Sequence, residues 1–126
     1  MIAADLVRRG YKIAIPYGED WDYDLIVCRD EKLERVQCKY TKSNGTFIHV
    51  QCRSHSLTNG KIKATKHYTD ETIDWLAVYD ATTERCYYIP AAELGPTGMW
   101  DLRLRLKPTL NNQRRRVRLA HAYLEI

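Results

Sequence analysis

The sequence lacks a long apolar run. The longest stretch without a charged residue covers ten residues, from Ser43 to Cys52, about half of what a membrane-spanning helix needs. We therefore expect neither a membrane span nor a secretory signal peptide. With 44% hydrophobic and 29% charged residues in a chain of 126, the composition excludes a largely disordered or fibrous protein and predicts one globular domain over residues 1–126.

Closely spaced cysteines are also absent. The chain has four, separated by 10, 14 and 34 positions, namely Cys28, Cys38, Cys52 and Cys86. A zinc site usually takes its thiolates in close pairs, so this spacing argues against one. Each cysteine lies in an apolar or alternating segment, and we interpret all of them as buried thiols in a reducing cytoplasm.

The sequence has little net charge, but the charge is unevenly distributed. The formal total is +4, yet residues 101–126 carry seven basic residues against two acidic ones, while residues 1–100 carry 13 against 14. Arg114, Arg115 and Arg116 are consecutive at the predicted start of a helix, where cations oppose the helix dipole. Phosphate contact would explain them, so the asymmetry predicts salt-dependent binding of nucleic acid.

The N-terminal half alternates short apolar segments with turn residues. We expect a short helix at 2–9, which ends at a glycine. Four strands follow, bounded by proline, glycine or charged residues, at 11–15, 23–28, 33–41 and 46–52. An Asn-Gly pair at 44–45 predicts that the last two strands form a hairpin.

The second half opens with a polar stretch, 53–72, which we interpret as a long loop. Strands at 73–79 and 85–89 are expected to form another hairpin, followed by a helical turn at 90–94. Residues 99–106 alternate as a half-buried strand does. A final helix would be capped by Asn111 or Asn112 and carry Val117, Leu119, Ala120 and Tyr123.

Polar residues on two neighbouring predicted strands show the clearest chemical pattern. In a strand over 33–41, Gln37 and Lys39 point the same way because side chains alternate. Asp24 begins the apolar run of the preceding strand, and Asp22 shares its face. If these strands pair as a hairpin, an Asp, a Gln and a Lys meet at one edge of the sheet.

This combination suits phosphodiester hydrolysis. A carboxylate and a neutral amide or backbone oxygen can hold a Mg²⁺ that keeps several waters and reaches a phosphate. The metal polarises the phosphoryl oxygen and lowers the pKa of a bound water, while an adjacent lysine orients that water and offsets developing charge. Taken singly, Lys39 is equally well explained as an exposed strand residue. The neighbouring Asp and Gln favour the catalytic role.

At these positions the chain resembles the PD-(D/E)XK nuclease superfamily. Its signature is an Asp at a strand start, a spacer, and then Asp or Glu, any residue and Lys on the next strand; Asp24, Gln37 and Lys39 match these positions. The chain is most similar to the bacterial group I intron-associated homing endonucleases, in which a Tyr-Asp-Leu triplet precedes a Val-Gln-x-Lys strand. Further shared segments, spread over nearly the whole chain, are 9–11, 16–19, 73–79, 88–90 and 111–113.

The resemblance implies an α/β, restriction-endonuclease-like core, with a mixed central β-sheet flanked by helices. It also implies a Mg²⁺-dependent endonuclease acting on double-stranded DNA, with Mn²⁺ able to substitute. Asp24, Gln37 and the backbone carbonyl of Cys38 would hold the metal, and Lys39 would position the water. So small a domain spans few base pairs, so a homodimer or homotetramer is expected. Basic side chains expected at the DNA are Arg53, Lys61, Lys63, Lys66, Arg114, Arg115 and Arg116.

One position departs from the family. Its members usually carry a Glu on the first helix, roughly three turns before the Gly-Tyr pair that here is Gly10-Tyr11. That position would fall before Met1, and Asp5 is too near Gly10 to replace it. We therefore expect either a truncated N-terminus or a site that lacks one ligand. A Holliday-junction resolvase, a phage or defence nuclease, and a catalytically inactive DNA-binding module stay open as alternatives.

Overall fold

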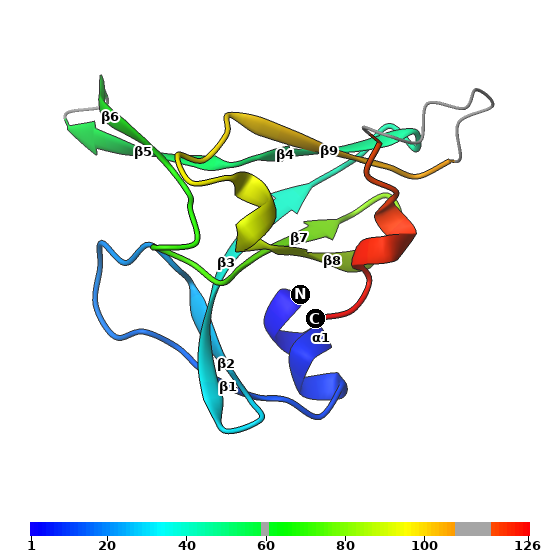
Figure 1. Ribbon diagram of the computed structural model, residues 1–126, viewed down its shortest axis with the longest axis horizontal. Helices are drawn as coiled ribbons and strands as arrows, with labels where there is room; N and C mark the ends of the chain where they lie inside the picture. Colours follow the sequence, from blue (N-terminus) through cyan, green and yellow to red (C-terminus); the bar gives the residue numbers. More distant parts are fainter. Residues whose placement is uncertain (59–60, 108–116) are drawn as a thin grey trace.

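The computed structural model describes residues 1–58, 61–107 and 117–126, apart from the side chains of 55–58 and 61–64. At its centre is a mixed sheet of five strands in the order β1-β2-β3-β7-β8 (Figure 1). Its central strand β3 is parallel to β7, and the other neighbouring pairs are antiparallel. The strands are β1 (Lys12–Ala14), β2 (Leu25–Arg29), β3 (Lys32–Thr41), β7 (Trp75–Asp80) and β8 (Arg85–Pro90). The two hairpins expected within this sheet, β2–β3 and β7–β8, are confirmed.

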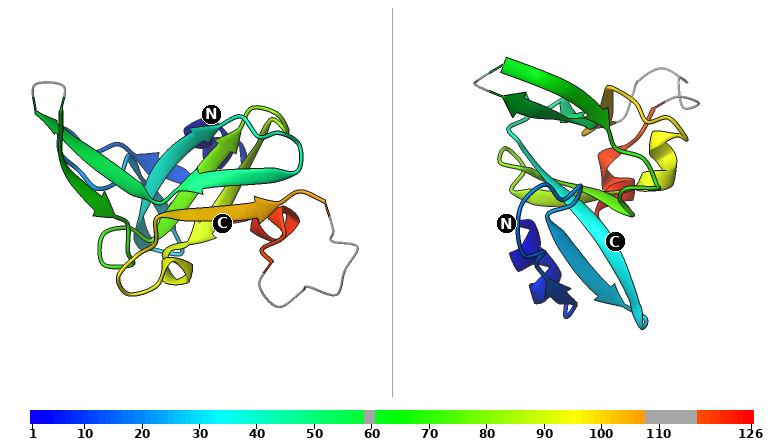
Figure 2. Two further views of the ribbon diagram at one scale, coloured as in Figure 1. Left: turned by 90° about the horizontal axis from the view of Figure 1, so that it is seen from above. Right: turned by 90° about the vertical axis from the view of Figure 1, so that its left-hand side faces the viewer.

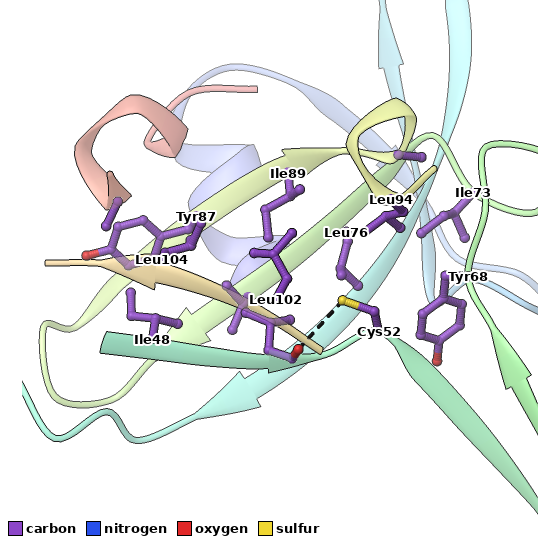
Figure 3. Close-up of a cluster of buried hydrophobic side chains, with 14 residues drawn as sticks. Ile48, Cys52, Tyr68, Ile73, Leu76, Tyr87, Ile89, Leu94, Leu102 and Leu104 are labelled. Carbon is purple, nitrogen blue, oxygen red and sulfur yellow. Dashed lines mark hydrogen bonds between the residues drawn. The ribbon is translucent and has the colours of Figure 1, made fainter. Parts of the chain in front are cut away.

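Different layers cover the two faces of this sheet, because its side chains alternate between them. The helix α1 (Ile2–Arg8) buries Ile2 and Leu6 on one face, with residues such as Val36 and Ala77. The other face carries the larger core, formed with β4 (Phe47–Gln51), β9 (Asp101–Arg105) and the 3-10 helices η1 (Ala91–Leu94) and η3 (Ala120–Tyr123) (Figure 3).

The expected long loop at 53–72 is wrong for most of its length. Strands β5 (Arg53–Thr58) and β6 (Lys61–His67) form an antiparallel hairpin, with Arg53 opposite His67 at its root. Figure 2 shows this hairpin extending away from the body of the protein. The polar composition follows from that position, because a two-stranded ribbon with little packed against it keeps polar side chains on both faces.

The hairpin expected between strands 33–41 and 46–52 is also wrong. Strand β3 pairs with β2 over residues 32–36 and with β7 over residues 36–41, and β4 joins neither side of it. β4 pairs instead with β9 in a separate two-stranded sheet. The Asn44 side chain accepts hydrogen bonds from the backbone N–H groups of Thr46 and Phe47, at 2.9 and 3.1 Å, and so turns the chain out of the central sheet.

The C-terminal segment contains less helix than expected. Asn111 and Asn112 lie outside the described residues. The described part of the segment is extended at Leu119 and becomes helical only in η3. The backbone N–H of Arg105 donates to the carbonyl of Arg118 at 2.7 Å, so the chain pairs with β9 where a helix was predicted.

All four cysteines are free thiols, as predicted, but only Cys52 and Cys86 are fully buried. Burial raises the pKa of Cys38 to about 12 and that of Cys52 to about 11, so both remain protonated at neutral pH. None of the described helices is both long and apolar enough to cross a membrane.

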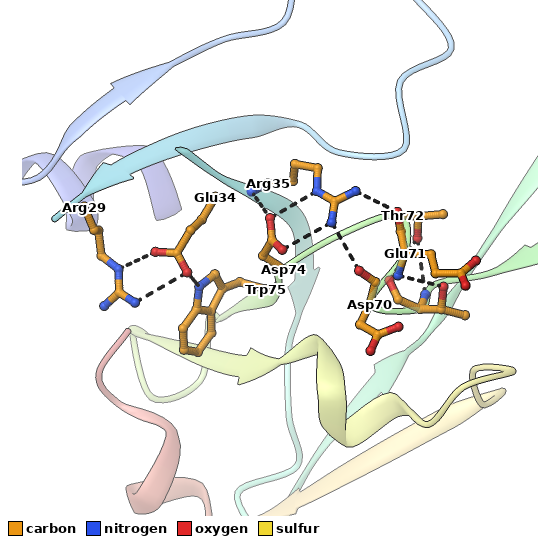
Figure 4. A network of polar contacts seen from close by, with 9 residues as sticks. Arg29, Glu34, Arg35, Asp70, Glu71, Thr72, Asp74 and Trp75 are labelled. Atoms are coloured by element: carbon orange, nitrogen blue, oxygen red, sulfur yellow. Dashed lines mark hydrogen bonds and ion pairs between the residues drawn. The ribbon is translucent and has the colours of Figure 1, made fainter. Parts of the chain in front are cut away.

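A polar network ties β7 to β3 just before the residues of interest (Figure 4). The Asp74 carboxylate accepts hydrogen bonds from the backbone N–H of Arg35 at 2.7 Å and from its guanidinium at 3.1 and 3.2 Å. The same guanidinium donates to the carbonyls of Asp70 and Glu71. Burial alone would raise the pKa of Asp74, but the contacts with Arg35 outweigh it and lower that pKa.

Candidate active site

Asp24 lies where β2 begins, at the open edge of the sheet. Its backbone N–H donates to the carbonyl of Val36 at 2.9 Å, and its carboxylate Oδ2 accepts from the backbone N–H of Cys38 at 3.0 Å. The β2–β3 ladder ends at the Leu25–Val36 pair, so β2 offers no backbone carbonyl to the N–H of Cys38. The Asp24 carboxylate accepts from this N–H instead. This contact fixes the carboxylate beside the Gln37–Lys39 segment.

Gln37 and Lys39 share the face of the sheet that bears the larger core. In the parallel ladder they are registered with Leu76 and Val78, which belong to that core. Cys38, between them, packs on the opposite face, toward α1. The alternation predicted for this strand is therefore confirmed.

The Lys39 ammonium is held close to this edge. Its Nζ donates a hydrogen bond to the carbonyl of Arg53 at 3.1 Å and lies 5.1 Å from the centre of the Tyr68 ring. Burial lowers the pKa of Lys39, while the nearby negative charge of Asp24 acts in the opposite direction. The Lys39 ammonium therefore lies close enough to Asp24 for the charge of that carboxylate to act on it.

Oxygen atoms suited to a divalent cation also gather here. The Gln37 amide lies against the Cys38 carbonyl, with Nε2 at 3.4 Å from that oxygen. Rotation of the amide by half a turn exchanges its nitrogen and oxygen, so the same side chain can offer Oε1. A carboxylate, an amide oxygen and a carbonyl oxygen are hard donors of the kind that Mg²⁺ prefers, and a site with one carboxylate leaves it several waters. The donor set therefore fits Mg²⁺.

No second acidic side chain from α1 reaches this set. Asp5 accepts hydrogen bonds from the hydroxyl of Tyr88 at 2.5 Å and from Arg9 at 2.9 Å, on the α1 side of the sheet. Within 1–58, 61–107 and 117–126, no three His, Cys, Asp or Glu side chains form a group that could hold a metal. Any ion at Asp24 would therefore depend on neutral oxygens.

The other predicted residues are spread around this edge. Asp22 forms an ion pair with Lys66 at 2.7 Å, which ties the segment before β2 to the hairpin. The Arg53 guanidinium is mostly covered: it lies 4.8 Å from the Trp100 ring centre and contacts Asp101 at 3.3 Å. Lys61 and Lys63 belong to β6, but the structure does not describe their side chains. Arg114, Arg115 and Arg116 lie outside the described residues.

Tyr68 is a part of the site that sequence reasoning missed. It follows β6 and is only 3% exposed, at the end of the larger core beside Cys52 (Figure 3). The polar composition of 53–72 concealed it, because an aromatic residue after a lysine-rich segment gives no sign of where it packs. Only the pairing of β5 with β6 returns the chain to Lys39.

Comparison with known proteins relates the chain to a family and to a solved structure. The whole chain, residues 1–126, matches a family described as PD-(D/E)XK endonuclease. Among solved structures, the fold is similar to that of a bacterial homing endonuclease, I-Ssp6803I, with a TM-score of 0.67 and 20% identity over 97% of this chain and 80% of that one. No curated protein matches. The expected restriction-endonuclease-like α/β fold is thereby confirmed.

Proposed function

Because the chain belongs to the PD-(D/E)XK endonuclease family, we propose that it is a Mg²⁺-dependent endonuclease that hydrolyses phosphodiester bonds of double-stranded DNA, in the manner of intron homing enzymes. The observation that supports the proposal is the position of Asp24 beside the segment of β3 that carries Gln37 and Lys39. The Asp24 carboxylate is bound to the amide of Cys38, between the other two residues.

Each residue would have a distinct role in the reaction. Asp24, Gln37 and the Cys38 carbonyl would hold the metal, for which Mn²⁺ can substitute. When bound, the ion supplies Lewis acidity toward the phosphoryl oxygen and a more acidic water. Lys39 would orient the attacking water and offset the negative charge that develops on the phosphate. Its ammonium is already fixed by the Arg53 carbonyl, so little reorganisation is needed at the moment of reaction.

The basic residues around the site would hold the DNA backbone. Lys66 lies next to the site and its side chain is 56% exposed, which suits a phosphate contact. The other DNA contacts that we propose are Lys61, Lys63, Arg53 and the run 114–116. Each chain carries one such site, so cutting both strands of a duplex would use two or four copies, and we propose a homodimer or homotetramer.

A second candidate is a catalytically inactive DNA-binding module. The observation in its favour is the position of Asp5, which is bonded to Tyr88 and Arg9 and contributes nothing at Asp24. With a single carboxylate, metal affinity would be weak. Binding of DNA without cutting would then be the whole activity.

A plasmid-cleavage assay separates these proposals. Supercoiled DNA would be incubated with Mg²⁺, Mn²⁺ or EDTA and with the wild type, Asp24→Asn or Lys39→Ala. Matched controls are Asp30→Asn and Lys32→Ala, because both residues are exposed at the β2–β3 turn, at the far end of the same strands. We expect metal-dependent nicking that the first two substitutions abolish and the controls retain.

Other results would contradict the proposal. Salt-sensitive DNA binding without nicking would support the inactive module. Nicking that survives both Asp24→Asn and Lys39→Ala would remove these residues from the reaction. Faster cutting of a four-way junction than of a linear duplex would favour a resolvase.

A further inference from the structure

We propose that Tyr68 positions the Lys39 ammonium for the reaction, by holding it over the face of its ring. The inference rests on the proposed function of Lys39. It starts from the 5.1 Å between Nζ and the ring centre, which is within the range of a cation–π contact. The face of an aromatic ring carries negative potential, so it attracts an ammonium without removing a proton from it.

The ring is itself rigidly held. Tyr68 is 3% exposed, and its backbone N–H donates to the carbonyl of Cys52 at 3.0 Å. Gly98 approaches so closely that a Cβ added there would be 2.9 Å from the carbonyl oxygen of Tyr68. A ring fixed from several directions can define the position of a flexible lysine.

The second contact of the ammonium comes from the other strand of the same hairpin. The Arg53 carbonyl accepts the hydrogen bond from Lys39, and the Arg53 guanidinium is in turn bonded to the carbonyl of Trp100 at 3.1 Å. The two ends of the β5–β6 hairpin therefore hold Lys39 from two directions. An ammonium has three N–H donors. Only one is engaged by a partner within the described residues, and two remain for water and phosphate.

A purely structural role for Tyr68 makes a different prediction from a positioning role. If Tyr68 only fills the core, any loss of activity should follow the loss of stability. If the ring positions Lys39, activity should follow the presence and charge distribution of the ring. Tyr87 supplies a matched control: it is also 3% exposed in the same core, and its hydroxyl donates to Thr83, away from Lys39.

The test compares Tyr68→Phe, Tyr68→Leu and Tyr87→Leu on a plasmid substrate. We expect Tyr68→Phe to retain kcat, and Tyr68→Leu to lose about 10- to 100-fold in kcat, since a displaced catalytic group costs that much. The Kd for DNA should stay unchanged in both. Tyr87→Leu should lose stability but keep kcat where it is folded.

A shape-conserving variant covers the case in which Tyr68→Leu does not fold. A trifluorinated phenylalanine at position 68 keeps the ring but removes most of the negative potential from its face. It should lower kcat relative to Tyr68→Phe. In folded protein without DNA, the NMR resonances of the Lys39 side chain should lose their ring-current shift in Tyr68→Leu but not in Tyr87→Leu.

Failure of this inference and failure of the proposed function give different results. A wild type that does not cut DNA contradicts the proposed function. A wild type that cuts and depends on Lys39, but tolerates Tyr68→Leu and the fluorinated ring, contradicts the positioning role. Lys39 resonances that do not respond to loss of the ring contradict the contact itself.

Discussion

Asp80 is the only charged residue fully buried in the described part of the chain, and its replacement by Asn should be strongly destabilising. Its carboxylate accepts five hydrogen bonds. Oδ1 accepts from the backbone N–H of Ser43 at 2.7 Å and that of Thr82 at 3.4 Å. Oδ2 accepts from the Ser43 hydroxyl at 2.9 Å and from the N–H and hydroxyl of Thr83 at 3.2 and 2.9 Å. These bonds fasten the end of β3 to the β7–β8 turn.

The size of the effect follows from the geometry of those donors. In Asp80→Asn, an amide NH₂ replaces one oxygen. In either orientation this NH₂ faces a backbone N–H, and two donors cannot form a hydrogen bond with each other. A hydrogen bond to a charged group contributes about 1.5–3 kcal/mol, and a buried donor left without a partner costs about 1–3 kcal/mol. We expect the free energy of unfolding to fall by about 2–4 kcal/mol, a large part of the stability of an ordinary domain.

The loss should depend on pH in a defined direction. Burial alone would raise the pKa of Asp80, but the bonds from Ser43 and Thr83 outweigh it and lower that pKa. The pKa of an aspartate in the unfolded chain is about 3.9. A carboxyl whose pKa is lower than this in the folded state stabilises the protein at pH values above the unfolded-state pKa. The contribution disappears as the pH falls through the folded-state pKa. The difference between wild type and Asp80→Asn should therefore be full at pH 7 and shrink in acid.

Urea unfolding followed by tryptophan fluorescence would measure this difference at a series of pH values. Asp30→Asn is the matched control, because Asp30 is exposed and the same chemical change there should stay within about 0.5 kcal/mol. Equal stability of Asp80→Asn and wild type at pH 7 would refute the reasoning. So would a difference that stays constant into strong acid.

Two further substitutions test the supports of the site. Gly98→Ala should lower the free energy of unfolding by about 2–4 kcal/mol, as measured in thermal melts. The added Cβ would lie 2.6 Å from the Cβ of His67, and residue 98 has a φ of +78°, which alanine rarely adopts. Gly45→Ala, at φ +86° with open space around it, should cost only about 1–2 kcal/mol; equal losses would show that the contact at Gly98 relaxes. Asp74→Asn should lower the free energy of unfolding in urea by about 1–2 kcal/mol, because it weakens the contacts with Arg35. A decrease as large at pH 2 as at pH 7 would count against that cause.

The sequence predicted the strands of the central sheet and the face that carries Gln37 and Lys39, because both depend on local alternation. Strand pairing is not local, and the Asn-Gly dipeptide shows the difference. At 44–45 it suggested a hairpin that does not form, because β4 pairs with β9 in a separate sheet. The same dipeptide stands at 59–60, between Thr58 and Lys61, which are paired. The dipeptide is a local signal, and only the rest of the sheet decides whether the flanking strands meet.

The candidate site shows the same limit. Asp24 directly precedes β2, and Gln37 and Lys39 lie on β3, the next strand of the same hairpin, so their closeness follows from a short stretch of sequence. Tyr68 and the Arg53 carbonyl come from a separate hairpin whose root returns to Lys39 only through the packing of the larger core. No periodicity within 53–72 contains that information.

The site also depends on a single register between β2 and β3. A slip of one residue would turn Gln37 and Lys39 toward α1 and bring Cys38 to the reactive face. Backbone ladders tolerate such a slip, so side chains must exclude it. Glu34 does so: it accepts from Arg29 at 2.6 Å across the β2–β3 turn and from the indole of Trp75 on β7 at 2.8 Å. Together with the Arg35–Asp74 pair, it locks β3 to both neighbours immediately before the residues that the proposed chemistry needs (Figure 4).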